Sequence, residues 1–335
     1  MIEDVDSTDW RPCSSIDIWR QRGQLYRQIR EFFYQRDVLE VDTPILSRFG
    51  NTDPQIESFV THDVAYDHRD SSDLQTWYLH TSPEFAMKRL LAAETCAIYQ
   101  LCKVFRREES GRYHNPEFTL LEWYRPGLNY HELMNEVAEL VSLSLEGSRK
   151  LDPCEKITYQ QAFVEIIGID PLRASVNELS NFVHSQQQSV QGLEDNDKDL
   201  WLDLIMGQFV QPRLGQNKLS FVYDFPASKA ALANIRSGAP PLAERFELFL
   251  DGIELANGYQ ELTDAQEVLR RFKNEQFIRS KNTQLAVDFD SRLISACSQG
   301  LPQCSGVAMG IDRLLLIITR QKTLKYVLAF CRNNA

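Results

Sequence analysis

Two apolar runs joined by a polar loop constrain the fold of this chain more than any other feature. The runs cover residues 97–108 (AIYQLCKVFRRE) and 117–125 (EFTLLEWYR), and the loop between them reads ESGRYHNP. Runs of this length that are rich in aromatic and aliphatic residues and bounded by turn residues predict antiparallel strands. We therefore expect a hairpin with a long polar tip.

One face of this hairpin is expected to combine several kinds of chemistry. Alternate side chains of a strand share a face, and Arg106 and Glu108 are expected to join that face from the first strand. At ~3.4 Å per residue, Phe118 and Glu122 lie about 14 Å apart, which matches an adenosine phosphate joined to an extended lysine. The alternative is that Arg106 and Glu108 are ordinary surface charges of the strand, paired across the sheet. The face of the second strand comprises Phe118, Leu120, Glu122 and Tyr124.

Three glutamates, Glu247, Glu254 and Glu261, recur every seven residues. This spacing would suit a helix, but Asp251-Gly252 and Asn257-Gly258 interrupt it and are turn signals. If Asp251-Gly252 is a two-residue hairpin loop, Glu247 and Glu254 are diagonal neighbours about 7–8 Å apart. Such a pair could hold Mg²⁺, and a bulge at Gly258 would bring Glu261 to the same face. A charged solvent-facing hairpin remains the alternative.

Other segments predict a mixture of helices and strands. Residues 16–33 have helical periodicity with Asp17 as a plausible cap, and Ser82 with Pro83 is expected to begin another helix. The segment SGVAMGIDRLLLII is expected to pass from a strand into a buried helix, with Gly306 and Gly310 allowing a ligand to approach the backbone. Residues 131–218 are expected to form a mainly helical insertion, and the glutamine-rich stretch 185–197 a surface loop.

Composition narrows the functional classes. The net charge of −11 weakens a tRNA partner, because non-specific nucleic-acid binding depends on basic patches. Seven cysteines without a CxxC pair indicate a reducing compartment, and the acidic N-terminus lacks a leader pattern. We therefore expect a cytoplasmic protein with no membrane association. We find no zinc-ligand spacing, and we expect the six histidines, including His114, to be structural or surface groups.

Three segments resemble the signatures of class II aminoacyl-tRNA synthetases. They are the helix followed by VLEVDTPIL, the stretch FRREESGRYHNPEFTLLEWY and the stretch GVAMGIDRLLL. The resemblance covers nearly the whole chain and implies an α+β fold with an antiparallel sheet flanked by helices. It also implies that residues 1–335 form a single catalytic domain, that ATP and Mg²⁺ are its cofactors, and that the protein is a homodimer.

The resemblance assigns roles to individual residues. Arg106 would clamp the α-phosphate and the substrate carboxylate, and Arg313 would bind the γ-phosphate, which makes these two the catalytic residues. The resemblance places Mg²⁺ on Glu247 and Glu254. The implied ATP-binding residues are Arg106, Arg107, Glu108, Asn115, Phe118, Glu254, Leu255, Gly310 and Arg313. The implied substrate-binding residues are Ser82, Glu84, Glu122, Tyr124, Asn257, Glu261 and Ala308.

The substrate class follows from the acidic residues of this expected pocket. Glu84, Glu122 and Glu261 would surround a ligand with two cationic groups, because buried carboxylates need partners. A diamino acid such as lysine fits, whereas an aspartate-specific site would need a cation.

Two features of this sequence depart from lysyl-tRNA synthetases and change which kind of lysine-type enzyme is expected. No anticodon-binding domain is expected, and Ala308 stands where those enzymes carry glycine, so its methyl would crowd an α-amine. Both features resemble the free-standing lysyl-tRNA synthetase paralogues that attach (R)-β-lysine to elongation factor P. The alternatives are a minimal synthetase acting on tRNA or a free amine, and an inactive synthetase-like binding protein.

Overall fold

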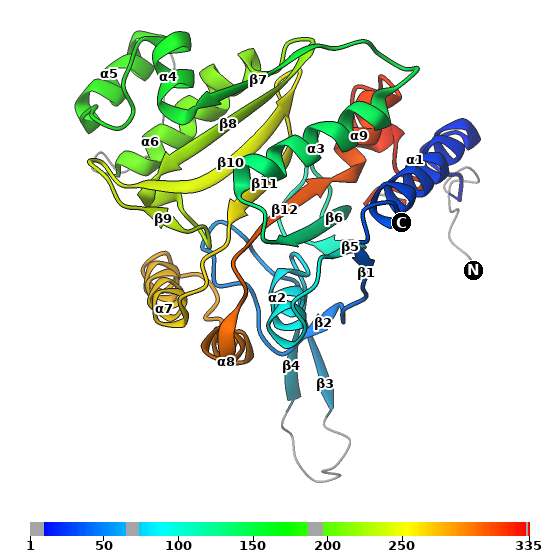
Figure 1. Cartoon of the computed structure of the whole chain (residues 1–335), viewed down its shortest axis with the longest axis horizontal. Helices are drawn as coiled ribbons and strands as arrows, with labels where there is room; N and C mark the ends of the chain where they lie inside the picture. Colours follow the sequence, from blue (N-terminus) through cyan, green and yellow to red (C-terminus); the bar gives the residue numbers. More distant parts are fainter. Residues whose placement is uncertain (1–9, 65–73, 187–196, 333) are drawn as a thin grey trace, which may run out of the picture.

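A computed structural model describes residues 10–64, 74–186, 197–332 and 334–335 (Figure 1). Its main element is a nine-stranded sheet in which eight strands follow the order β1-β5-β6-β12-β11-β10-β8-β7 and β9 pairs with β10. Within the described part of this sheet, β1 pairs with β5 and β7 with β8 in parallel, and the other pairs are antiparallel. The bounds are β1 (Leu39–Glu40), β5 (Ile98–Phe105), β6 (Glu117–Pro126), β12 (Cys304–Gly310), β11 (Ile253–Gln260), β10 (Leu242–Leu250), β8 (Lys218–Pro226), β7 (Asp152–Thr158) and β9 (Ile235–Arg236).

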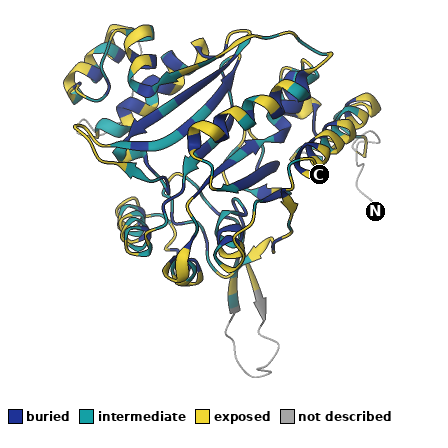
Figure 2. Cartoon of the chain, in the orientation of Figure 1, coloured by how far each residue is buried: buried dark blue, intermediate teal, exposed yellow. Residues whose placement is uncertain are grey.

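Helices cover the sheet in three groups (Figure 1). One core joins α1 (Ile16–Tyr34), α3 (Tyr130–Leu145) and α9 (Ile311–Ile318) to the apolar face of the central strands. A second core joins α4 (Tyr159–Ile167), α5 (Val176–Ser185) and α6 (Lys198–Ile205) to β8 and β10. A third joins α2 (Glu84–Ala93), α7 (Ala265–Lys281) and α8 (Ser291–Gly300). The central strands are mostly buried, as Figure 2 shows.

A small second sheet carries the chain from β1 to α2. Its order is β2-β4-β3, with β2 (Leu46–Ser47), β3 (Val60–Val64) and β4 (Leu74–Leu79) all antiparallel. The loop at residues 50–57 between β2 and β3 lies beside the cleft described below. This sheet was not anticipated as a unit, because two of its strands pair across a long connection.

The architecture confirms the expected α+β fold and its mostly antiparallel sheet. Three local expectations are corrected. The cap of α1 is Ser15, and Asp17 lies within the first turn. Helix α2 begins at Glu84 with Pro83 as its cap, although the Ser82 hydroxyl accepts a hydrogen bond from the Glu84 N–H at 3.4 Å. Strand β5 ends at Phe105, so the prediction that residues 106–108 belong to this strand is wrong.

Residues 131–218 contain helices, but they also contain β7, which extends the main sheet. Helix α3 packs in the same core as α1 and α9, so it belongs with the sheet rather than with the second helical group. Residues 187–196 of the expected glutamine-rich loop lie outside the described residues. No described helix has the length and apolar character required to cross a membrane.

Candidate active site

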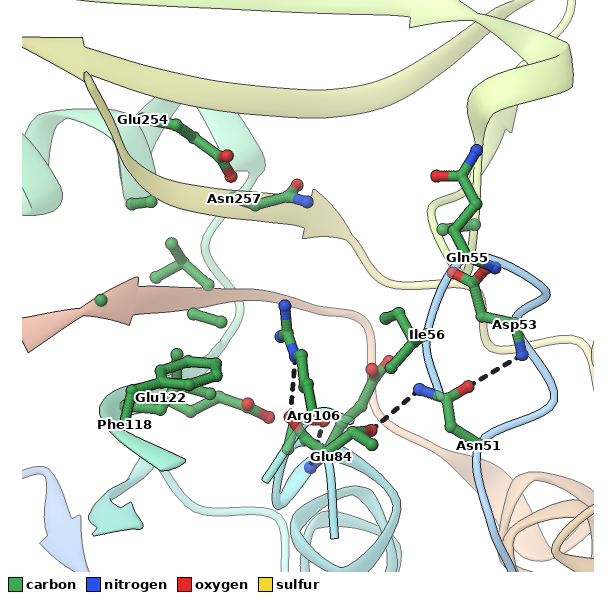
Figure 3. Close-up of a pocket in the computed structure, with 18 of the residues that line it drawn as sticks. Asn51, Asp53, Gln55, Ile56, Glu84, Arg106, Phe118, Glu122, Glu254 and Asn257 are labelled. Atoms are coloured by element: carbon green, nitrogen blue, oxygen red, sulfur yellow. Dashed lines mark hydrogen bonds between the residues drawn. The ribbon is translucent and has the colours of Figure 1, made fainter. Parts of the chain in front are cut away.

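A cleft of about 410 Å³, seen close up in Figure 3, lies on the face of the main sheet opposite α1 and α3, and Arg313 in the first turn of α9 reaches it. Strands β6, β11 and β12 supply its floor, and the β5–β6 loop, the start of α2 and one side of α7 supply its walls. Most of the residues predicted from sequence line it together: Ser82, Glu84, Arg106, Asn115, Phe118, Glu122, Tyr124, Glu254, Leu255, Asn257, Glu261, Ala308, Gly310 and Arg313. Arg107, Glu108 and Glu247 do not line it.

The β6 face provides the central platform. Phe118, Leu120, Glu122 and Tyr124 all line the cleft, which agrees with the alternation of a strand. The Arg106 guanidinium lies over the Phe118 ring at 5.1 Å from its centroid, and Arg106 Nε donates to the Thr81 carbonyl at 3.3 Å. Figure 3 shows both side chains directed into the cavity. An aromatic face and a fixed cation therefore lie side by side.

Arg107 and Glu108 point elsewhere because the strand ends before them. The Arg107 N–H donates to the Glu57 carbonyl, and the Glu108 backbone has a φ of 71°, which breaks the alternation that was expected to bring it to the cleft. Arg107 and Glu108 form an exposed ion pair of 3.1 Å. Glu109 lines the cleft instead, with its carboxylate 3.4 Å from Arg106 Nη1.

The Asp251-Gly252 hairpin has the expected register at its tip, where Phe249 faces Glu254. The expected bulge exists, but it is not at Gly258. The register passes from Phe249↔Glu254 to Leu248↔Ala256, so Leu255 is the extra residue. This bulge brings Glu254, Asn257 and Glu261 to the cleft face of β11.

The two expected magnesium ligands are held by arginines. Glu247 faces Asn257 across β10 and β11, and its carboxylate lies 2.5 Å from Arg245, which also donates to the Asn257 amide oxygen at 3.2 Å. Burial raises the pKa of Glu247 to about 7. Glu254 pairs with Arg313 at 3.4 Å. Among the described residues, no group of three or more acidic, cysteine or histidine side chains could hold a metal.

A buried lysine, Lys88, was missed by the sequence reasoning. Its ammonium lies 2.6 Å from carboxylate oxygens of both Glu84 and Glu261, and its side chain is 2% exposed. The two carboxylates together hold the pKa of Lys88 above its ordinary value despite its burial. The i, i+4 spacing of Glu84 and Lys88 on a helix was the available signal, but it does not reveal that Glu261 completes the bridge.

Glu122 is the carboxylate that lacks a full set of partners. Its Oε1 accepts from the Tyr124 hydroxyl at 2.7 Å, whereas its buried Oε2 has no hydrogen-bond partner. Burial, and next the Glu84 carboxylate, raise the pKa of Glu122 to about 8. A cation placed at Oε2 would favour the ionised form. The geometry thus leaves one buried acceptor for a ligand ammonium.

Two small residues of β12 shape this part of the floor. Ala308 pairs with Glu122 on one side and Asn257 on the other, so its methyl lies between them on the cleft face. A methyl added at Gly306 would lie 2.4 Å from both the Glu261 carboxylate and the Tyr124 ring. Gly306 therefore makes room for these protein side chains, and both Gly306 and Gly310 line the cleft.

Arg313 ties the β5–β6 loop to β11. Its guanidinium donates to the Tyr113 carbonyl at 3.2 Å and the Glu254 carbonyl at 2.9 Å, and it lies 2.8 Å from His114 Nε2. Burial, and next the charge of Arg313, lower the pKa of His114. His114 thus faces the cleft as a neutral acceptor, a role that the sequence reasoning did not give it.

Comparisons with known proteins agree with this geometry. The family model of the class II tRNA synthetases (D, K and N) matches residues 7–334. The elongation factor P–(R)-β-lysine ligase of Pseudoalteromonas translucida is 46% identical over 321 residues, covering 96% of this chain and 97% of that protein. The protein of the same name from Vibrio cholerae is 45% identical over 326 residues, covering 97% of this chain and 98% of that protein. The one from Histophilus somni (strain 2336) is 44% identical over 321 residues, covering 96% of this chain and 97% of that protein.

Proposed function

Since this chain belongs to the class II tRNA synthetases (D, K and N), we propose that it is a ligase that activates (R)-β-lysine with ATP and transfers it to a lysine of elongation factor P. The acceptor and substrate follow the names of its relatives. The observation that carries the proposal is a single cleft with an arginine and an aromatic ring at one end and the buried, incompletely bonded Glu122 at the other.

The nucleotide would occupy the end formed by β6, β11 and α9. Phe118 offers a ring for the adenine, and Arg106 beside it offers a planar guanidinium that can bond oxyanions in two places. For Arg313 to bind a phosphate, it would exchange its contacts with His114 and the Glu254 side chain. Asn115, Leu255 and Gly310 line the same end. Arg107 and Glu108 would reach a nucleotide only if the loop changed conformation.

Glu254 and Glu247 fit Mg²⁺ through their carboxylate oxygens, the ligands that this ion prefers. Glu254 faces the cleft, and Glu247 would contribute only the part of its carboxylate that Arg245 leaves open. When bound, the ion would neutralise charge on the ATP phosphates. Phosphate oxygens of ATP are further ligands of the kind that this ion prefers.

The amino acid would occupy the end formed by Glu84, Glu122 and Tyr124. Because Lys88 already neutralises Glu84 and Glu261 in part, the side-chain ammonium would bind where Glu122 Oε2 lacks a partner. Its second amine would lie near Ser82, Asn257 and the Ala308 methyl. A β-amine is one carbon further from the carboxyl than an α-amine, so a floor that the methyl raises would favour the β isomer.

The chain's own residues would act mainly by positioning and by stabilising charge. Arg106 would hold the substrate carboxylate against the α-phosphate, and the carboxylate oxygen would attack phosphorus as pyrophosphate leaves. Arg313 would hold the departing phosphates. An acceptor amine would then attack the carbonyl carbon, forming the amide and releasing AMP.

We further propose that residues 1–335 act as one catalytic domain in a cytoplasmic homodimer. Exposed apolar side chains cluster in sequence on α1, β1, β2 and the segment between the two strands. They are Trp19, Tyr34, Leu39, Ile45 and Leu46. A second copy of the chain would bury these groups.

Pyrophosphate exchange into ATP with (R)-β-lysine and α-lysine side by side tests the activation step. Transfer of labelled amino acid to elongation factor P or to tRNA tests the acceptor. Preference for β-lysine with label on the protein supports the proposal. Preference for α-lysine with label on tRNA would make the chain a minimal tRNA synthetase, and no exchange with any diamino acid would make it a binding protein.

A further inference from the structure

Glu275 on α7 lines the active-site cleft, and none of the roles proposed above for the activation step falls to it. The Thr52 hydroxyl donates to its Oε2 at 2.5 Å, and Thr52 is itself fully buried. Thr52 lies in the loop that joins β2 to β3, so the carboxylate is fixed between two elements. A carboxylate oriented in this way faces the cleft in one defined position.

The charged neighbours of Glu275 are mostly acidic. Asp53 from the loop and Glu84 from α2 are its acidic neighbours, and Arg271 on its own helix is its basic neighbour. Arg271 is engaged by Glu267 and by the carbonyls of Ala231 and Ala233. Burial, with Asp53 and Glu84 adding to it, raises the pKa of Glu275 to about 7.

A short chain of contacts links this carboxylate to the reaction centre. Arg106 Nε donates to the Thr81 carbonyl, and the Asn51 amide donates to the Thr81 hydroxyl at 2.9 Å. Asn51 is next to Thr52 in sequence. Figure 3 shows Arg106 between Phe118 and the loop residues Asn51 and Asp53, which lie on the side of the cleft away from Glu254. A group entering past this loop would meet the activated carboxyl at Arg106.

We propose that Glu275 is the general base of the transfer step, which rests on the function proposed above. The acceptor lysine arrives as an ammonium, and Glu275 takes one proton to give a neutral amine and a protonated carboxyl. The amine nitrogen bonds to the carbonyl carbon of the adenylate, and the carbon–oxygen bond to phosphate breaks. The second amine proton leaves with the phosphate of AMP, and Glu275 returns its proton to water.

Several other titratable groups of the cleft are already engaged, and Asp53 accepts a hydrogen bond from the Gln55 N–H in the loop itself. Glu84 and Glu261 hold Lys88, and Glu109 pairs with Arg106. His114 lies against the guanidinium of Arg313. Glu122 is bonded to Tyr124 deep in the amino-acid end. Glu275 is the carboxylate that combines access from the loop side, a fixed orientation and a proton affinity suited to neutral pH.

The test compares wild-type enzyme with Glu275→Gln, which keeps the size of the side chain and an oxygen for Thr52. Pyrophosphate exchange measures the first step, so its retention shows that the variant is folded and binds its substrates. Single-turnover transfer from the preformed adenylate to elongation factor P is expected to fall about 10²–10⁴-fold, the range of general-base catalysis. Transfer to hydroxylamine, which is uncharged at neutral pH, is expected to be unaffected.

The pH profile separates a base from a structural role. Wild-type transfer should rise with pH and level off above about 7, where Glu275 is ionised, whereas Glu275→Gln should rise steadily with the free amine. Asp53→Asn is the matched variant: loss of its charge lowers the pKa of Glu275, so the inflection should move to lower pH. Equal losses with both nucleophiles, or wild-type transfer rates in Glu275→Gln, would overturn the inference. Failure of wild-type enzyme to modify elongation factor P would instead refute the proposed function.

Discussion

Ala308 is a single methyl group between two polar side chains of the amino-acid pocket. Its strand neighbours are Glu122 and Asn257, so replacing it with glycine deepens the floor at the position expected for the substrate amine. We expect Ala308→Gly to shift the selectivity from β-lysine toward α-lysine by about tenfold or more, the effect of one methyl group in a fitted pocket. Pyrophosphate exchange with both isomers measures this ratio, and an unchanged ratio would show that the methyl does not discriminate.

Lys88 is the second residue on which the pocket depends. Lys88→Met would leave the buried Glu261 and the partly exposed Glu84 without their cation, which we expect to cost about 3–5 kcal/mol in the free energy of unfolding. The control is Lys103→Met, which removes an exposed 3.4 Å pair with Glu117 and should cost about 1 kcal/mol or less. Urea unfolding of both variants measures the difference.

The pH dependence of the Lys88→Met variant has a definite sign. Burial already raises the pKa of Glu261, and loss of the ammonium raises it further. A carboxyl whose pKa is higher in the folded state than in the unfolded state binds more protons when folded, so its contribution to stability falls as pH rises. The loss in the free energy of unfolding of Lys88→Met relative to wild type should therefore grow between pH 5 and pH 8. A loss that is constant over this range would contradict the inferred role of Lys88 in bridging Glu84 and Glu261.

At the scale of elements, strand β12 depends on glycine where β6 and β11 bring large side chains together. A methyl at position 306 would overlap the Glu261 carboxylate and the Tyr124 ring at 2.4 Å, whereas a methyl at position 310 has its nearest neighbour, Arg313 Cδ, at 3.7 Å. We expect Gly306→Ala to lose about 1–3 kcal/mol of stability through overpacking and Gly310→Ala to lose much less. Thermal unfolding of the two variants measures this, and equal losses would refute the packing argument.

The sequence predicted those parts of the site that depend on local periodicity. Alternation on β6 correctly brought Phe118 and Glu122 to one face, and the Asp251-Gly252 turn correctly set the hairpin tip. Errors arose where the alternation broke. Strand β5 ended at Phe105, before Glu108 with its positive φ. The bulge fell at Leu255 because a bulge depends on pairing with β10 rather than on glycine alone.

Partners brought together from distant elements could not be predicted in the same way. Lys88 shares a helix with Glu84, but its contact with Glu261 requires α2 to pack against the end of β11. The bond from Thr52 to Glu275 spans 223 positions of the chain. Such contacts follow from tertiary packing, which hydrophobic periodicity does not specify.

At the scale of the whole molecule, the outer side of α1 and the adjoining short strands expose apolar groups that the cores do not use (Figure 2). Tyr34 is 82% exposed and Leu39 is 58% exposed. After β1 the chain continues to Thr43, whose hydroxyl donates to the Gln100 amide oxygen, and Gln100 pairs with Glu122 of the cleft. An interface on this surface would therefore hold one edge of the catalytic sheet in place.

We expect a solution mass of twice 38.7 kDa, and we expect Leu39→Glu to reduce it to that of one chain, because it would bury a charge at the interface. The matched control is Leu200→Glu, which alters another exposed leucine on α6, far from this surface. Light scattering over a range of concentrations measures both masses. If the interface also supports the cleft, Leu39→Glu should lower pyrophosphate exchange in parallel with dimer content. A monomeric wild-type protein with full activity would show that the apolar surface serves another purpose.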